Sequence, residues 1–151
     1  MKDTLTSVIL SIKPTYSQAI VSGTKKVEFR KKKFKRPVDK IFIYSSSPEK
    51  LIIGYFTISE IVQDSPKNLW KTFNEVGGIT EIDFFEYYKD AELGFSIIID
   101  KVYKFENGID PIDFIEKFCA PQSYIYVEEK RLLSAVKNPA SANNHARAKT
   151  P

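Results

Sequence analysis

Four charged residues lie close together in the segment from Gly23 to Arg30, and three of them, Lys25, Glu28 and Arg30, have the types and spacing that could do chemistry. Lys25 and Arg30 are cations that can neutralise phosphates, and Arg30 can also grip one phosphate through paired hydrogen bonds or stack on a base. Glu28 brings a different chemistry, because a carboxylate accepts hydrogen bonds from a ribose 2′-hydroxyl or a base amine, or acts as a base. The residue types therefore indicate selective recognition of a nucleotide, or catalysis, rather than phosphate binding alone.

Two other interpretations of the same residues stay open. Glu28 on a wet strand face could simply pair with Arg30 or Lys26, an interaction that contributes about 0 to 1 kcal/mol. Without further context the residue types favour that surface ion pair. If the residues are catalytic, Lys25 and Glu28 are the candidates for an acid and base pair, and Arg30 would stabilise the negative charge that develops in phosphodiester cleavage.

A strand and a short helix are expected to lead into this segment. Residues 7–12 are apolar and β-branched, which predicts a buried strand that Lys13 and Pro14 end. Residues 15–22 place apolar side chains at helical spacing, and Gly23 follows with the chemistry of a C-terminal cap. The charged segment therefore begins where a helix ends.

The alternation after this helix predicts a second strand over residues 26–30. Val27 and Phe29 would face inward. The other side of the strand would carry Lys26, Glu28 and Arg30 together. These three charges are therefore expected to share one surface, and Lys25 is expected at the edge of that surface.

The remaining pattern predicts a mixed fold. Strands are expected over residues 38–44, 51–62, 94–105 and 121–127, and helices over residues 66–76, 80–88 and 110–118. Gly54 inside the long strand indicates a bulge or a close approach of two backbones. Several strands with one early helix and a helical pair inserted late predict an α+β fold, in which a mixed sheet curls toward a β-barrel with peripheral helices.

Composition favours one domain in a reducing compartment. The chain has 151 residues, of which 42% are hydrophobic, enough for one core. We expect a domain over residues 1–130 and a disordered tail over residues 131–151, which contains the single histidine, His145. A single cysteine, Cys119, excludes an internal disulfide, and the absence of a signal peptide or an apolar span predicts a cytoplasmic protein that does not enter membranes.

The residue types also exclude several kinds of site. Mechanisms that depend on histidine need one in the folded part of the chain, so a two-histidine ribonuclease or a Ser-His-Asp hydrolase is not expected. No cluster has zinc spacing, and carboxylates are too scarce near Glu28 for a two-metal site. We therefore expect neither a metal nor a cofactor.

The formal charge of +4 is concentrated in residues 25–40, and the rest of the chain is slightly acidic. The cations are Lys25, Lys26, Arg30, Lys31, Lys32, Lys33, Lys35, Arg36 and Lys40, and they are opposed only by Glu28 and Asp39. This imbalance predicts a local cationic patch suited to nucleic acid, although a lysine run can also serve solubility alone.

The order of these features resembles the ASCH family, a branch of the PUA-like β-barrel proteins. Gly23, Lys25, Glu28 and Arg30 form the pattern G-x-K-x-x-E-x-R, preceded by the sequence LSIKP and a short helix. The likeness covers about residues 7 to 127 and includes the strand end IYSSSP and the closing turn PQS. The resemblance implies a curled PUA-like sheet with a cleft at the motif.

The resemblance also implies RNA-related functions, which include RNA binding, RNA processing and a coactivator-like role in transcriptional regulation. It implies an RNA or nucleotide partner and leaves the oligomeric state open. The residues expected to bind in the cleft are Lys13, Lys25, Glu28, Arg30, Ser45, Ser46, Gln122 and Ser123. The implied alternative is an enzyme that acts on RNA or on a modified nucleoside, with Lys25 and Glu28 as the catalytic candidates.

Bacterial ASCH members that resemble N4-acetylcytidine amidohydrolases have a threonine where this chain has Glu28. Thr24 lies outside the matching register, Glu60 is the nearest candidate for an added acid, and the serines at 45–47 could supply a hydroxyl. These departures favour binding over that hydrolase activity. A third hypothesis is a protein interaction domain whose partner meets the aromatic residues of the helix expected over residues 80–88, namely Phe84, Phe85, Tyr87 and Tyr88.

Overall fold

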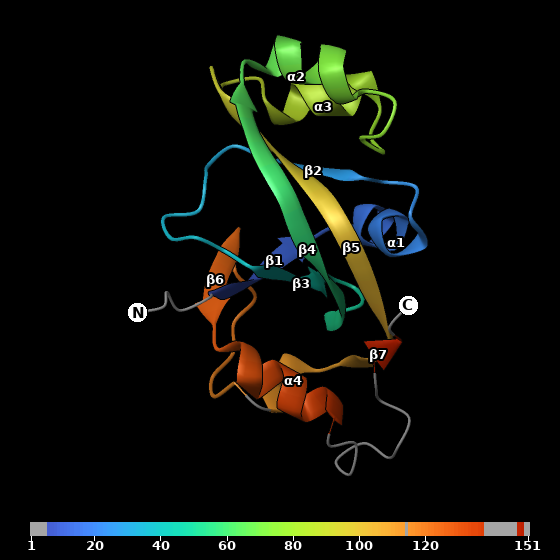
Figure 1. Ribbon diagram of the computed structural model, residues 1–151, viewed down its shortest axis with the longest axis vertical. Coiled ribbons are helices and arrows are strands. Elements are labelled where there is room, and N and C mark those ends of the chain that lie inside the picture. The colour runs from blue at the N-terminus through green and yellow to red at the C-terminus, as the bar shows by residue number, and fades with distance from the viewer. Residues whose placement is uncertain (1–5, 114, 138–147, 150–151) are drawn as a thin grey trace.

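The computed structural model describes residues 6–113, 115–137 and 148–149. Long strands run the length of the molecule, with a helical pair at one end and a single helix at the other (Figure 1). The elements in chain order are β1 (Ser7–Ile12), α1 (Pro14–Ser22), β2 (Val27–Arg30), β3 (Lys40–Ser45), β4 (Leu51–Asp64), α2 (Pro66–Phe73), α3 (Glu81–Tyr87), β5 (Gly94–Ile109), a 3₁₀ turn (Pro111–Asp113), β6 (Tyr124–Val127), α4 (Glu129–Lys137) and β7 (Ala148–Lys149).

All strands join one curled mixed sheet in the order β2-β5-β4-β3-β1-β6, with β7 paired to β5. β1 and β3 are parallel, whereas the other pairs are antiparallel. The end strands β2 and β6 are not paired to each other within the described residues. The expected α+β fold with a curled mixed sheet is confirmed as a half-barrel whose open edges are β2 and β6.

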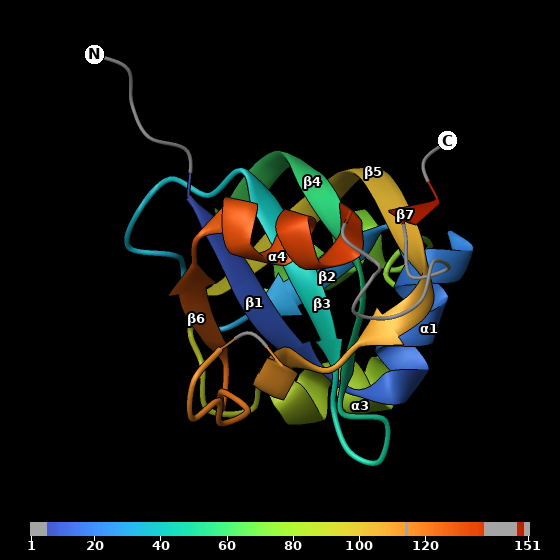
Figure 2. The same cartoon turned by 90° about the horizontal axis from the view of Figure 1, so that it is seen from below.

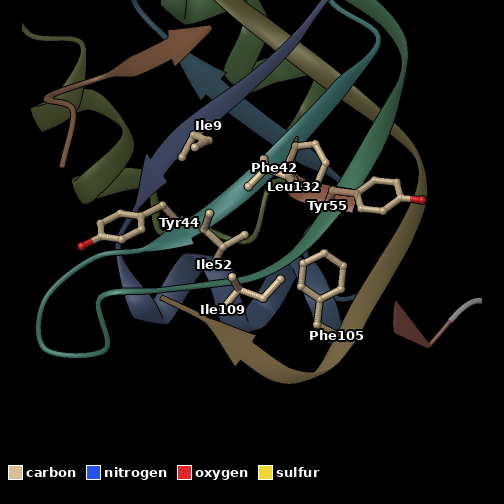
Figure 3. Packing of buried hydrophobic residues seen from close by; sticks show 8 residues of the cluster. All are labelled: Ile9, Phe42, Tyr44, Ile52, Tyr55, Phe105, Ile109 and Leu132. Carbon is tan, nitrogen blue, oxygen red and sulfur yellow. The ribbon is translucent and has the colours of Figure 1, made fainter. Parts of the chain in front are cut away.

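The sheet is covered on both faces, which explains why β3 is an unbroken apolar run. Ile41 and Ile43 pack in the cluster that includes Ile20 of α1, while Phe42 and Tyr44 pack in the cluster that includes Leu132 of α4. Figure 3 shows this second cluster, and Figure 2 shows α4 lying across the end of the sheet. α4 crosses the domain boundary expected at residue 130, because Leu132 is fully buried.

The helical pair α2 and α3 is inserted between β4 and β5 and packs on the inner residues of β2. Val27 and Phe29 share a cluster with Leu69 and Phe84, and the rings of Phe29 and Phe84 meet edge to face at 4.9 Å. The expected inward direction of Val27 and Phe29 is confirmed. This packing fixes α3 beside the face of β2 that carries Glu28 and Arg30.

Several local predictions are confirmed by the backbone. Gly23 caps α1 with a φ of 89°, and Ser65 and Thr80 cap α2 and α3 through their side-chain oxygens. The register shifts beside Gly54, where an added Cβ would collide with the backbone of β5. Both the bulge and the close approach expected at this glycine are present.

The prediction of a helix over residues 110–118 is wrong. β5 continues to Ile109, and only a 3₁₀ turn follows, in which the Asp110 carboxylate accepts a hydrogen bond from the Ile112 N–H at 3.1 Å. Lys117 has a φ of 55°, which an α-helix does not accommodate. Residue 114 of the expected helix lies outside the described residues. His145 of the expected tail also lies outside them.

Candidate functional site

A cavity of about 500 Å³ opens between α1, β2 and α3. The end of β1 contributes Ser11 and Ile12, and the turn after β3 contributes Ser46. The further lining residues are Lys13, Tyr16, Lys25, Glu28, Phe29, Arg30, Ile79, Asp83, Glu86, Tyr87 and Gln122. A volume of this size is within the range of small-ligand pockets.

Lys25 is the most unusual residue of the cavity, because its side chain is almost completely buried. It is only 2% exposed, and its ammonium donates to the Gly77 carbonyl at 2.5 Å. The ammonium also lies 5.2 Å from the ring centre of Tyr16 and 5.0 Å from that of Phe29. Burial lowers the pKa of Lys25 below its usual value, and the nearby Glu28 carboxylate only partly opposes this effect.

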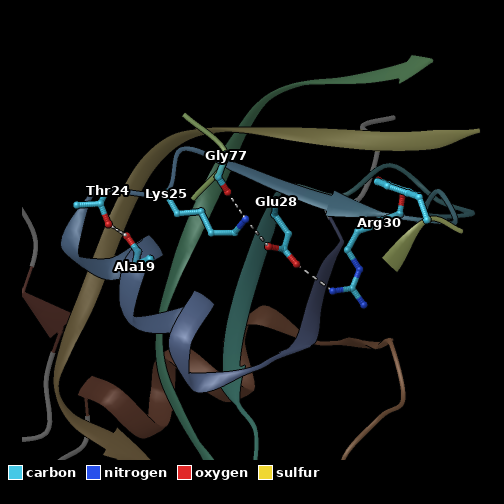
Figure 4. Close-up of polar contacts among 7 residues, drawn as sticks. Ala19, Thr24, Lys25, Glu28, Arg30 and Gly77 are labelled. Carbon is cyan, nitrogen blue, oxygen red and sulfur yellow. Dashed lines mark hydrogen bonds and ion pairs between the residues drawn. The ribbon is translucent and has the colours of Figure 1, made fainter. Parts of the chain in front are cut away.

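Glu28 connects Lys25 to Arg30 in one row of charges (Figure 4). One carboxylate oxygen lies 3.8 Å from the Lys25 Nζ, and the other accepts a hydrogen bond from the Arg30 Nη1 at 2.9 Å. Glu28 is 5% exposed. The pair is therefore not the wet surface ion pair that sequence alone favoured, because it lies inside a cavity where charges interact more strongly.

Arg30 also connects the two open edges of the half-barrel. Its Nη2 donates to the Ser123 Oγ at 3.2 Å, and its backbone carbonyl accepts a hydrogen bond from the Tyr88 hydroxyl at 2.9 Å. Ser123 directly precedes β6, whereas Arg30 ends β2. The guanidinium is therefore held by Glu28 and Ser123, while Tyr88 holds the backbone of the same residue.

The walls of the cavity are aromatic on two sides and acidic on one rim. Tyr16 of α1 and Tyr87 of α3 are half-buried, and both line the space above Glu28. Burial raises the pKa of Tyr16, and the negative charges of Asp83 and Glu28 raise it further. Asp83 and Glu86 are exposed on the α3 side, so the cavity combines a cationic interior with carboxylates at one edge.

Two consecutive glycines allow the segment between α2 and α3 to close over Lys25. A Cβ at Gly78 would lie 2.7 Å from the Cβ of Lys25, and a Cβ at Gly77 would lie 2.8 Å from the Phe29 ring. Gly78 also has a φ of 62°, which side chains rarely adopt. The glycine pair therefore packs directly against Lys25 and Phe29, two residues that line the cavity.

The structure brings together most of the residues expected in the cleft. Lys13, Ser46 and Gln122 line the cavity with the central charged row, and Ser123 binds Arg30 from outside it. Ser45 does not reach the cavity, since it is fully buried and its hydroxyl lies 2.7 Å from that of Ser17. This buried hydrogen bond connects α1 with β3.

Other residues that were expected to contribute to the site lie away from the cavity. Lys26 precedes β2, is exposed and does not line the cavity, so Lys26, Glu28 and Arg30 do not share one surface as expected. The Thr24 hydroxyl donates to the Ala19 carbonyl at 3.2 Å, and neither Thr24 nor Glu60 lines the cavity. Of the hydroxyls considered as nucleophiles, Ser46 is the one at the cavity.

The basic segment of residues 31–36 is anchored through aromatic residues of β6. The Tyr126 hydroxyl accepts hydrogen bonds from the Lys35 and Arg36 backbone N–H groups at 3.0 and 3.2 Å. The Arg36 guanidinium lies 3.7 Å from the centre of the Tyr126 ring. Lys31, Lys32 and Lys33 remain exposed, so the segment presents its charges from a fixed backbone.

Sequence reasoning missed the aromatic and acidic walls. Tyr16 and Tyr87 belong to residue types that usually pack in cores, and Asp83 and Glu86 looked like ordinary polar positions of a surface helix. The aromatic residues of α3 are buried or half-buried against β2, which removes the exposed surface that a protein partner was expected to meet. Within the described residues, no cluster of three or more His, Cys, Asp or Glu could hold a metal ion.

Comparisons with known proteins agree with this architecture. The ASCH domain family model matches residues 10–118. The chain is 29% identical over 130 residues to an ASCH domain-containing ribonuclease of Zymomonas mobilis, covering 81% of this chain and 84% of that protein. The crystal structure of ASCH from Zymomonas mobilis superposes with a TM-score of 0.79 at 25% identity, covering 87% of this chain and 94% of that chain.

A more distant structural neighbour shares the fold alone. The N-terminal domain of McrB from Staphylothermus marinus has a TM-score of 0.52 at 16% identity, covering 87% of this chain and 95% of that chain. No helix in the described part of the chain is long and apolar enough to cross a membrane. With a family match over residues 10–118, which include the whole G-x-K-x-x-E-x-R motif, this chain belongs to the ASCH domain family.

Proposed function

We propose that this protein binds RNA and holds one nucleotide in the cavity around Lys25, Glu28 and Arg30. The observation that carries the proposal is the buried row of alternating charges that lines a cavity of about 500 Å³ between two tyrosines. Buried charges are costly to maintain, and sites that keep them are candidates for function. The similarity to a named ASCH ribonuclease supports RNA as the ligand.

The basic segment of residues 31–36 is proposed to contact the phosphate backbone beside the cavity. It starts at the cavity rim, where the Lys31 ammonium lies 4.9 Å from the ring centre of Tyr87. A second, more open cavity of about 610 Å³ is lined by Lys33, Lys35 and Arg36 together with Phe95. Because phosphate contacts release counterions, this part of the binding energy depends on salt.

Reversing the charges of Lys31, Lys32, Lys33 and Lys35 to Glu is expected to weaken RNA binding strongly. Each lost phosphate contact lowers the slope of log affinity against log salt by about 0.7 for a single strand, so the slope should fall by about 3. Fluorescence anisotropy titrations of a labelled single-stranded RNA between 50 and 200 mM salt measure this slope.

The matched control reverses four exposed lysines elsewhere, namely Lys50, Lys67, Lys71 and Lys101. Both variants carry the same net charge, so a general electrostatic effect would weaken them equally. An equal loss of RNA affinity in the two variants would contradict a specific contact between the RNA backbone and residues 31–36. Dissociation constants that stay above the micromolar range for every RNA at low salt would contradict the RNA-binding function itself.

A second candidate function is RNA cleavage in the same cavity. It is favoured by the lowered pKa of Lys25 and by the name of the Zymomonas mobilis relative. A neutral Lys25 amine would take the proton of a ribose 2′-hydroxyl, the 2′-oxygen would attack phosphorus, and the bond to the 5′-oxygen would break. That leaving oxygen would take a proton from water, while Arg30 donates hydrogen bonds to the charged phosphoryl oxygens.

This mechanism predicts a rate that rises with pH and levels off below 10.5, the usual pKa of a lysine. The reason is that the base is active only after it loses its proton, and burial lowers the pH at which this happens. Cleavage of an end-labelled RNA, corrected for the protein-free reaction at each pH, measures the profile. A Lys25→Met variant should show no rise above background, and equal rates in the two proteins would exclude Lys25 as the base.

A further inference from the structure

The charged row in the cavity presents hydrogen-bonding groups in a fixed alternation of donor, acceptor and donor. The Lys25 ammonium and the Arg30 guanidinium can only donate, whereas the Glu28 carboxylate between them accepts. Figure 4 shows the three side chains following one another in this order. The alternation is held in place, because the Gly77 carbonyl fixes Lys25 and the Ser123 hydroxyl fixes Arg30.

Each member of the row keeps bonding capacity for a ligand. A carboxylate oxygen accepts about two hydrogen bonds, and each Glu28 oxygen has one cationic neighbour. A guanidinium has five donors, and two nitrogens of Arg30 have one partner each. The remaining hydrogen-bonding capacity of the three side chains therefore suits a ligand whose edge presents an acceptor, a donor and an acceptor in that order.

Among the four RNA bases, uracil presents that edge. Its O4, N3–H and O2 are an acceptor, a donor and an acceptor. Guanine places an amine donor against one of the cations, cytosine places its N3 acceptor against Glu28, and adenine places its amine against a cation and its N1 against the carboxylate. Unpaired or opposed buried polar groups are penalised more than matched groups are rewarded.

We propose that the cavity selects a uracil base, with Lys25, Glu28 and Arg30 reading its Watson–Crick edge. This inference rests on the proposed nucleotide binding and names the base that the site prefers. Tyr16 and Tyr87 line the same cavity and can stack on the base. In the described residues, the recognition set is therefore the charged row together with these two rings.

The charges around the cavity also orient the nucleotide. Asp83 and Glu86 on the α3 rim repel a phosphate, whereas Lys13 is exposed at the cavity and Lys31 lies beside Tyr87. The base therefore enters the interior, and its phosphates lie along Lys13 and the basic segment. This position differs from that of the cleavage mechanism, in which a phosphoryl group would occupy Arg30.

Binding of single-stranded heptamers that differ only in their central base tests the selection. The probes carry adenines on both sides of a central U, C, G, A or N3-methyluridine, and 2′-fluoro sugars prevent cleavage through the 2′-oxygen. We expect at least ten-fold tighter binding of the uridine probe than of the cytidine and N3-methyluridine probes, measured by fluorescence anisotropy. Methylation at N3 replaces the hydrogen of the central donor with a methyl group and leaves O2 and O4 in place, so this comparison uses the unaltered protein.

A Glu28→Gln variant changes the central acceptor without changing its shape. The glutamine amide can donate to the N3 of cytosine, so the ratio of uridine to cytidine affinity should fall at least ten-fold. Glu106→Gln is the matched control, because Glu106 is exposed and does not line the cavity, so its neutralisation should leave the ratio unchanged.

The outcomes separate the two proposals. Binding of all probes with equal affinity, or tightest binding of the cytidine probe, would overturn uracil selection and leave RNA binding in place. Equal affinity for uridine and N3-methyluridine would also overturn it. Failure to bind any probe, or any unmodified RNA, would remove the proposed function on which the selection rests.

Discussion

Replacing Glu28 with methionine should destabilise the fold by about 3 kcal/mol, whereas Lys25→Met should change stability by less than about 1 kcal/mol. The two residues form one buried pair, yet the consequences of removing them differ. Without Glu28, a buried ammonium and a partly buried guanidinium remain in the cavity without their shared counter-charge. Without Lys25, the pair of Glu28 and Arg30 is intact, and the cost of burying the ammonium disappears.

The difference between these variants should depend on pH. Loss of Glu28 removes the contributions that raise the pKa of Lys25, so its pKa should fall further below 10.5. A lysine with a lowered pKa in the folded state destabilises the fold most at low pH, and this cost is relieved as pH rises through the folded pKa. The destabilisation by Glu28→Met should therefore be larger at pH 6 than at pH 9.

Urea unfolding of the three proteins at both pH values measures these effects. RNA titration of the same samples should show at least ten-fold weaker binding for both variants, because each one loses a member of the charged row. Equal destabilisation by the two substitutions would indicate that the row is held by packing rather than by charge compensation. Unchanged RNA binding in Lys25→Met would place the nucleotide outside the cavity.

The elements around the motif were predictable because their patterns are local. β1 coincides with the expected strand, and Gly23 acts as the expected cap of α1. Caps and alternation depend on neighbours within a few residues, so sequence alone reveals them. The end of β5 illustrates the limit, since the strand expected to stop at residue 105 continues to Ile109 through its antiparallel pairing with β4, which depends on residues far away in the chain.

The composition of the cavity required the tertiary structure. Lys25 and Glu28 were predicted from the motif, but their burial was not, because it arises from the segment between α2 and α3 closing over β2. Tyr16 and Tyr87 are distant in sequence and line the same cavity because α3 belongs to the segment inserted between β4 and β5. Ser45 shows the reverse case, since the serine run was expected in the cleft and the parallel pairing with β1 places its first member in the core.

The contacts of Lys25 show how the inserted segment could control the site. One side of the ammonium faces Gly77, and the other faces Glu28 and the cavity. The backbone N–H of Lys26 also donates to the Val76 carbonyl at 2.8 Å, so two consecutive residues before β2 bind the same turn. Any change in this turn is therefore transmitted directly to the position of Lys25.

Gly78→Ala is expected to destabilise the protein by about 1 to 3 kcal/mol more than Gly23→Ala does. Both glycines have left-handed backbones, with φ angles of 62° and 89°, so both alanine variants lose about 1 to 2 kcal/mol from the backbone alone. They differ in packing, because a Cβ at Gly23 has no neighbour within 4 Å, whereas a Cβ at Gly78 collides with Lys25 at 2.7 Å. The excess cost therefore measures the close packing on Lys25.

The same pair of variants connects stability to function. The colliding atoms at Gly78 include the Lys25 Cα at 3.2 Å, so the lysine backbone must move and a side-chain rotation does not suffice. We expect Gly78→Ala to weaken RNA binding at least ten-fold and Gly23→Ala to leave it unchanged. Binding is measured without urea, at a temperature where both variants are folded. If both variants lose equal stability and bind RNA equally, the turn does not position Lys25, since the two glycines differ mainly in that contact.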